Sequence, residues 1–230
     1  MITITLNSKN FLKFNFLIIT GFVILHLISE LIISEVDTNT ILYAIKIQLS
    51  LHSERNLPTF YAGCLLIISS LLLLLLRNIS KRKYERRLLL LMSTLASFLS
   101  FDEMFMLHEH IAKMMRLNEN FSTPFNVDWI IPYSILSIFS FLIGKRFLLS
   151  QPIEIKRLLI LSASIYIFGE LGLEILEDII KSDIFLIPKN YIYLSSFFEE
   201  TLGLIGITLL NYTLLKMISH KSSKLQLNIL

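Results

Sequence analysis

Residues 158–180 read LLILSASIYIFGELGLEILEDII. A stretch of this length and apolar character can cross a bilayer as a helix, because about 20 predominantly apolar residues suffice. It contains no Lys or Arg, yet it carries Glu170, Glu174 and Glu177. A helix formed here would bring carboxyl groups into the membrane without a basic residue of its own to neutralise them.

Apolar stretches of similar length recur along the chain. With 157–180 they are 14–34, 57–77, 88–112, 127–149 and 190–217. The 230 residues are 54% hydrophobic and only 17% charged, with a mean hydropathy of +0.67, whereas a soluble domain carries about 25% charged residues. The sequence therefore predicts an all-α integral membrane protein, a bundle of six transmembrane helices that forms a single domain over 1–230.

Basic residues gather in alternate connections between these spans. They are Lys9, Lys13, Arg77, Lys81, Arg82, Lys83, Arg86, Arg87, Lys145, Arg146, Lys156, Arg157, Lys216, Lys221 and Lys224. By the positive-inside rule these connections face the cytoplasm, so both termini are expected to be cytoplasmic. The shorter apolar stretch 39–51, which contains Lys46, is expected to form an interfacial helix on the outer surface.

The acids inside the spans are the strongest functional signal. A carboxylate at the bilayer centre costs about 2.5–3.5 kcal/mol, so several together would exceed the roughly 5–15 kcal/mol by which a typical domain is stable. They must be protonated, hydrated in a cavity or bound to cations. With a rise of about 1.5 Å per residue, the acids of four spans fall at one depth, in the outer half of the membrane.

Helical periodicity also puts these acids on common faces. If 88–112 is one helix, Glu109 and His110 share a stripe with Asp102 and Glu103, and His108 points away from it. Carboxylate and imidazole groups that project inward from several helices are the pattern of a metal site in a bundle core. The candidate ligands are Asp102, Glu103, Glu109, His110, Glu170, Glu174, Glu177, Glu200, His26 and Glu30.

The residue types limit the kind of metal. Oxygen-rich sites favour Mg, Ca or Mn, and added imidazole favours Fe or Zn, so we expect a divalent ion such as Fe, Zn, Mn or Ca. A site built on cysteines is excluded, since Cys64 is the single cysteine. The paired Glu-x-x-His motif of soluble di-iron bundles is also absent.

Three functions fit this pattern. The first is a metal-dependent membrane enzyme, a hydrolase or an oxidoreductase, that acts on a lipid or lipid-linked substrate with Glu199 or His110 as acid–base group. The second is a proton- or cation-coupled transporter or channel. The third is an accessory subunit whose acids pair with a partner's basic residues. Membrane lipids and a lipid-like substrate are the expected partners, and nucleic acid is not. In a bacterial plasma membrane the site would face the periplasm or exterior.

Overall fold

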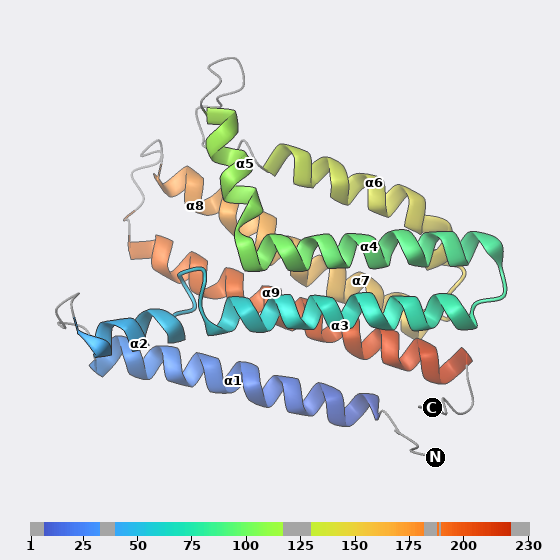
Figure 1. The fold of residues 1–230 in the computed structure, drawn as a ribbon, viewed down its shortest axis with the longest axis horizontal. Helices are drawn as coiled ribbons and strands as arrows, with labels where there is room; N and C mark the ends of the chain where they lie inside the picture. The colour runs from blue at the N-terminus through green and yellow to red at the C-terminus, as the bar shows by residue number, and fades with distance from the viewer. Residues whose placement is uncertain (1–6, 33–39, 117–129, 182–187, 189, 222–230) are drawn as a thin grey trace.

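A computed structural model describes residues 7–32, 40–116, 130–181, 188 and 190–221, and within them every regular element is a helix (Figure 1). In chain order the elements are α1 (Ser8–Ile32), α2 (Ile41–Leu49), α3 (Leu57–Ile79), α4 (Lys83–Phe105), α5 (Leu107–Arg116), α6 (Ile130–Leu149), α7 (Ile153–Ile167), the π-helix η1 (Phe168–Leu173), α8 (Glu174–Lys181) and α9 (Asn190–Lys221).

Six segments are long and apolar enough to cross a membrane. They are Ser8–Leu31, Leu57–Ile79, Lys83–Phe105, Ile130–Leu149, Ile153–Lys181 and Tyr191–Lys221. The fifth combines α7, η1 and α8 into one span. The prediction of an all-helical chain with six membrane-length segments is confirmed within the described residues. The short apolar stretch between the first and second segments forms α2, whose N-terminus is capped by Thr40.

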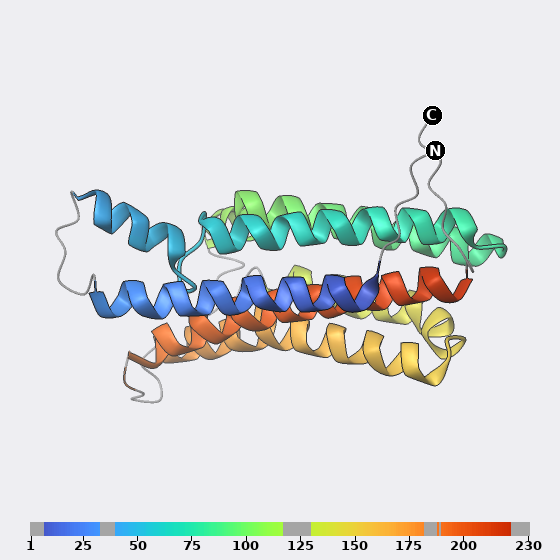
Figure 2. The same cartoon turned by 90° about the horizontal axis from the view of Figure 1, so that it is seen from below.

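The helices α3 and α9 form the centre of the bundle (Figures 1 and 2). In their most apolar windows 56% and 61% of the residues are buried, against 6% in α6. Apolar side chains of α3, α4, α7 and α9 fill one core, and residues of α1, α3 and α9 with Leu51 fill a second. Because α9 contacts α1, α3, α7, η1 and α8, its polar residues can meet those of several other helices.

Hydroxyl and amide groups tie the central helices together. Ser70 of α3 lies 2.8 Å from the Ser93 hydroxyl and 2.9 Å from the Ser97 hydroxyl of α4. Ser69 donates a hydrogen bond of 2.8 Å to Asn211 of α9. Such interhelical bonds position helices in a membrane, where the hydrophobic effect gives no preference for one packing over another.

The expectation of one continuous helix over 88–112 is wrong. The helix α4 ends at Phe105. The next residue, Met106, adopts the left-handed conformation with φ 54°, and α5 leaves at a new angle (Figure 1). A left-handed conformation is unfavourable for a residue with a Cβ. It is held here because the Asp102 carboxylate accepts the backbone N–H of His108 at 2.7 Å and so caps the first turn of α5.

The bundle has two chemically different ends. The start of α1, the α3–α4 and α6–α7 connections and the end of α9 lie together at one end in Figure 1, and they carry most of the basic residues. We call this the basic end. The intramembrane acids belong to the other half, since Glu103 is in the last turns of α4, and η1 and α8 follow α7 towards the opposite end.

Candidate functional site

Three glutamates from three different elements lie close enough inside the bundle to act on one another electrostatically. Glu103 of α4 interacts electrostatically with Glu170 of η1, and each of them interacts with Glu200 of α9. We call Glu103, Glu170 and Glu200 the central trio. Apart from carboxyl groups, the charged group that acts on all three is the imidazole of His108.

The position of Glu170 depends on two local features of the backbone. The π-helix η1 widens the span at Glu170, and single π-helical turns occur frequently at functional sites. Opposite it, α9 carries Gly203, where an added Cβ would collide with Oε1 of Glu170. An added Cβ at Gly206 would lie 2.8 Å from Tyr166. The glycines of α9 therefore make room for this carboxyl group and for the close approach of the two helices.

A second trio of carboxyl groups lies next to the first, between α8 and α9. One oxygen each from Glu174, Glu177 and Glu199 can be chosen so that all three lie within 4.8 Å of one another. We call these residues the α8–α9 trio. Glu199 interacts electrostatically with Glu174 and Glu177 and also with Glu170 and Glu200, so it connects the two trios.

The α8–α9 trio is partly stabilised by neighbouring groups. The Glu177 side chain is 5% exposed, accepts a hydrogen bond from the hydroxyl of Ser196, and lies 3.1 Å from the ammonium of Lys181. Lys181 stands at the edge of the trio with 43% of its side chain exposed. The contacts of Glu177 are therefore made with groups at the edge of the trio, on α8 and α9.

Asp102 has a structural role that accounts for its carboxylate. Besides the backbone N–H of His108, it faces Nδ1 of the same histidine at 3.2 Å. Both contacts are made by one carboxylate oxygen, Oδ1. Asp102 therefore acts as the cap that joins α4 to α5.

His108 points towards the acids, and the expectation that it points away from them is wrong. Its Nε2 lies 3.5 Å from Glu54 and its Nδ1 3.2 Å from Asp102. Burial opposes a charge on the ring, but the hydrogen bonds to Asp102 and Glu54 outweigh it and raise the pKa of His108 to about 11. The side chain is thus an imidazolium within the acidic region. The turn at Met106 reverses the expected orientation.

The same turn removes two predicted ligands from the group. Glu109 and His110 are both exposed on α5, and Nδ1 of His110 lies 2.8 Å from the Met106 carbonyl. Their expected position on the stripe of Asp102 and Glu103 required an unbroken helix. His110, proposed from the sequence as an acid–base group, lies outside the two trios.

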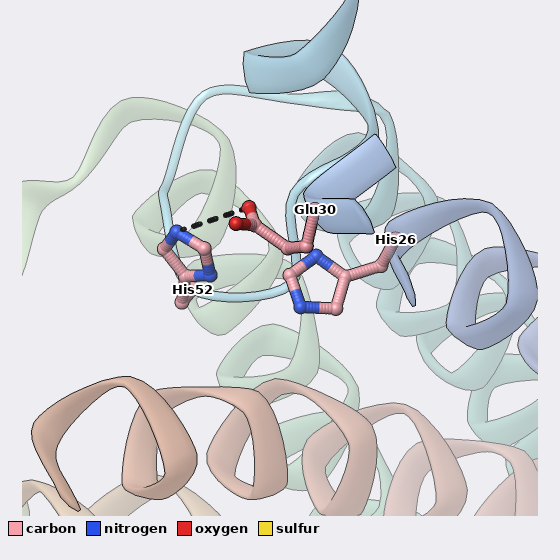
Figure 3. A group of neighbouring side chains, drawn as sticks. All are labelled: His26, Glu30 and His52. Atoms are coloured by element: carbon pink, nitrogen blue, oxygen red, sulfur yellow. Dashed lines mark ion pairs between the residues drawn. The ribbon is translucent and has the colours of Figure 1, made fainter. Parts of the chain in front are cut away.

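His26 and Glu30 belong to a separate group with His52, shown in Figure 3. The Glu30 carboxylate lies beside the two imidazole rings, which contact each other edge to face with their centroids 5.2 Å apart. Donor atoms of the three residues also lie within 4.8 Å of one another. The carboxylate is already paired, since the ammonium of Lys46 is 2.9 Å away and Nε2 of His52 is 3.9 Å away. We call these residues the histidine cluster.

The tautomer of His26 argues against a metal in the histidine cluster. Its Nδ1 accepts the backbone N–H of Leu51 at 3.2 Å. A neutral imidazole that accepts through Nδ1 carries its proton on Nε2, so neither nitrogen offers a free lone pair. The structure therefore presents His26 as a hydrogen-bonding residue that holds the connection before α3.

Sequence reasoning missed three residues of these groups, His52, Glu54 and His108. The first two lie in the stretch LHSERN over 51–56, where charged residues crowd between two apolar stretches. This group of polar residues between two apolar stretches could have indicated His52 and Glu54 as candidate site residues. The orientation of His108 had none, because the left-handed residue that ends a helix is usually Gly or Asn and here is Met106.

Comparison with other proteins gives a family and no function. No curated protein and no solved structure matches the chain. A family described as a domain of unknown function, DUF8692, matches residues 17–217. This match spans all six membrane-length segments at least in part and most of the sequence. The protein therefore belongs to the DUF8692 family.

Proposed function

We propose that this protein is a membrane protein that binds one divalent cation through the α8–α9 trio and uses it in enzymatic chemistry on a lipid or lipid-linked substrate. The observation that carries the proposal is the approach of Glu174, Glu177 and Glu199 to within 4.8 Å of one another at their oxygens. Carboxylates crowded in this way repel unless protons or a cation lie between them. The central trio beside them adds to that repulsion.

The donor set favours a hard cation. All three groups offer oxygen, the ligand that Mg²⁺, Mn²⁺ and Ca²⁺ prefer, and the trio contains no imidazole or thiolate. The imidazole of His108 is engaged by Asp102 and Glu54, and that of His52 lies beside Glu30. Among the ions expected from the sequence, Mn and Ca are therefore better candidates than Fe and Zn.

The two trios have different roles in this proposal: one binds the cation and the other transfers protons. A cation held by the α8–α9 trio would polarise a carbonyl or phosphoryl oxygen of the substrate. Glu170 and Glu200 lie close enough to interact with Glu199, so either can hold or release a proton beside the bound substrate. Glu199, named from the sequence as an acid–base group, is better assigned as a ligand that joins the trios.

We place the basic end in the cytoplasm and the acids in the outer half of the membrane, with both termini inside. The alternation of basic connections supports this orientation. In a bacterial plasma membrane the site would then open to the periplasm or exterior.

A one-sided site favours an enzyme over a transporter. Between the acids and the basic end lies the apolar core of α3, α4, α7 and α9, with Leu76, Leu89 and Leu214 fully or almost fully buried. A transported ion would have to pass this core. Ion flux in proteoliposomes that stops in a Glu199→Gln variant would favour transport instead.

The proposal is tested by Mn²⁺ binding to detergent-purified protein, measured by electron paramagnetic resonance together with elemental analysis. We expect about one ion per wild-type chain and an affinity at least about 100-fold lower in Glu199→Gln, because loss of a ligand costs more than the 10–100-fold typical of a residue that only orients one. The control is Glu109→Gln, the same chemical change at an exposed carboxyl group of α5. Equal affinities in the two variants, or no Mn²⁺ in the wild type, would contradict the proposal.

A further inference from the structure

Unpaired basic side chains are concentrated where α4 begins. Lys81, Lys83, Arg86 and Arg87 are exposed, and the described residues place no carboxylate within ion-pair distance of them. Glu85, the acid in the middle of this stretch, is already engaged, 3.6 Å from Arg82 and 3.0 Å from Lys221. The positive charge here is therefore in clear excess.

Tyr84 joins this stretch to the end of α6. Its hydroxyl donates a 2.7 Å hydrogen bond to the Ile143 carbonyl, and the Arg146 guanidinium lies 5.6 Å from the centre of its ring. Lys145 and Arg146 are also exposed. Figure 1 shows the start of α4 and the end of α6 side by side at the basic end. We call the combined surface the basic edge; its residues are Lys81, Lys83, Arg86, Arg87, Lys145 and Arg146.

Two cations at the end of α9, by contrast, are neutralised. Lys216 pairs with Glu154, and Lys221 pairs with Glu85 and contacts Ser80. The basic edge gathers exposed basic side chains on two helix ends that Tyr84 holds together, and the described residues place no carboxylate within ion-pair distance of them. This local excess of positive charge favours a partner of opposite charge.

The position of the basic edge identifies the chemistry of that partner. It lies at the ends of two membrane-length helices, the depth at which lipid headgroups lie. Groups of 4–8 Lys and Arg beside a transmembrane helix bind anionic lipids, and guanidinium groups bind phosphate oxygens in pairs. We propose that the basic edge binds the phosphate headgroup of an anionic glycerophospholipid. This inference stands independently of the cation site.

The test is a titration of the full-length protein in detergent micelles with phosphatidylglycerol, followed by native mass spectrometry. The variant Arg86→Gln/Arg87→Gln is compared with Lys9→Gln/Lys13→Gln, which removes the same charge from exposed residues of α1 at the same end. We expect the affinity of the first variant for phosphatidylglycerol to fall at least about tenfold. The affinity of the second variant should change less than about twofold. Phosphatidylcholine should distinguish none of the proteins.

Three outcomes would overturn the proposal. The first is an equal loss of lipid affinity in both variants, which would indicate diffuse electrostatic attraction. The second is unchanged lipid binding in the Arg86→Gln/Arg87→Gln variant. The third is binding of inorganic phosphate as tight as that of the lipid, which would indicate a site for soluble anions. Arg86→Lys/Arg87→Lys keeps the charge and should retain most of the lipid binding. Comparison with this variant shows whether weaker lipid binding comes from the lost charge or from a disturbed fold.

Discussion

The two groups of ionisable residues in the half of the bundle opposite the basic end differ in how their negative charge is balanced. In the histidine cluster the Glu30 carboxylate has the Lys46 ammonium 2.9 Å away, and His26 is occupied by the Leu51 amide. In the two carboxyl trios six glutamates lie near one another, with Lys181 paired to Glu177 at the rim and the imidazolium of His108 acting on the central trio. A short distance between possible ligands is common to both groups, but the trios bring more carboxyl groups together, and such crowding favours an added cation or protons.

The difference shows that short distances between possible ligands are weak evidence for a metal site unless the charges around them are also considered. Both groups contain three donors within 4.8 Å. A paired carboxylate and an imidazole whose nitrogens are both committed already have a stable arrangement without metal. We therefore expect changes in the trios to affect cation binding, and changes in the histidine cluster to affect stability and its dependence on pH.

The largest effect on stability is expected from His108→Ala. The substitution removes the imidazolium between Asp102 and Glu54 and leaves two carboxylates unpaired, which costs about 3 kcal/mol for a mostly buried ion pair. Thermal unfolding in detergent measures the loss. The control is His110→Ala, the same substitution two residues along on the exposed side of α5. If the two variants unfold at the same temperature, the imidazolium does not stabilise the acidic region.

A smaller effect is expected from Lys46→Met in the histidine cluster. It leaves Glu30 without its ammonium partner, and because 36% of the Glu30 side chain is exposed, solvent reduces the loss to about 1 kcal/mol. The same denaturation assay applies, with exposed Lys9→Met as control. Mn²⁺ affinity should stay at the wild-type value. A new Mn²⁺ site in Lys46→Met would break the distinction between the two groups, since it would show that Lys46 alone keeps metal out.

The smallest effect is the pH dependence contributed by His52. Burial is the largest influence and lowers the pKa of His52, and the Glu30 carboxylate only partly offsets it. Below pH of about 6.5 the unfolded chain therefore binds more protons at this position, and stability falls with decreasing pH by less than about 1 kcal/mol. His52→Gln should flatten this acidic limb of a plot of unfolding temperature against pH.

The contribution of His108 to stability changes with pH in the opposite direction to that of His52, so His108 serves as an internal comparison. With its pKa at about 11 in the folded protein, its contribution is complete below pH of about 6.5 and is lost as pH rises from there towards 11. His108→Gln should therefore flatten the alkaline limb and leave the acidic limb in place. If His52→Gln alters the alkaline limb instead, the assignment of the two histidines is wrong.

The sequence predicted those parts of the candidate site that depend on the order of residues within a single helix. Glu170, Glu174 and Glu177 follow a helical spacing, and both Glu199 and Glu200 lie in the stretch 190–215, which contains no Lys or Arg, so their chemistry could be inferred from order along the chain. The errors arose where a single backbone dihedral mattered. At Met106 a φ of 54° turned His108 inward and carried Glu109 and His110 out to the surface.

The amino-acid sequence by itself determined that this is an all-helical protein with six membrane-length segments, because apolar length and hydrogen bonding within a bilayer allow little else. It also determined which ionisable residues the membrane would have to accommodate. Only the tertiary structure decided how they are grouped. The glycines of α9 admit Glu170 and Tyr166, the cap by Asp102 redirects α5, and Lys46 reaches Glu30 from another helix. These are contacts between elements, and their distances depend on how helices pack, which the periodicity of any one helix does not specify.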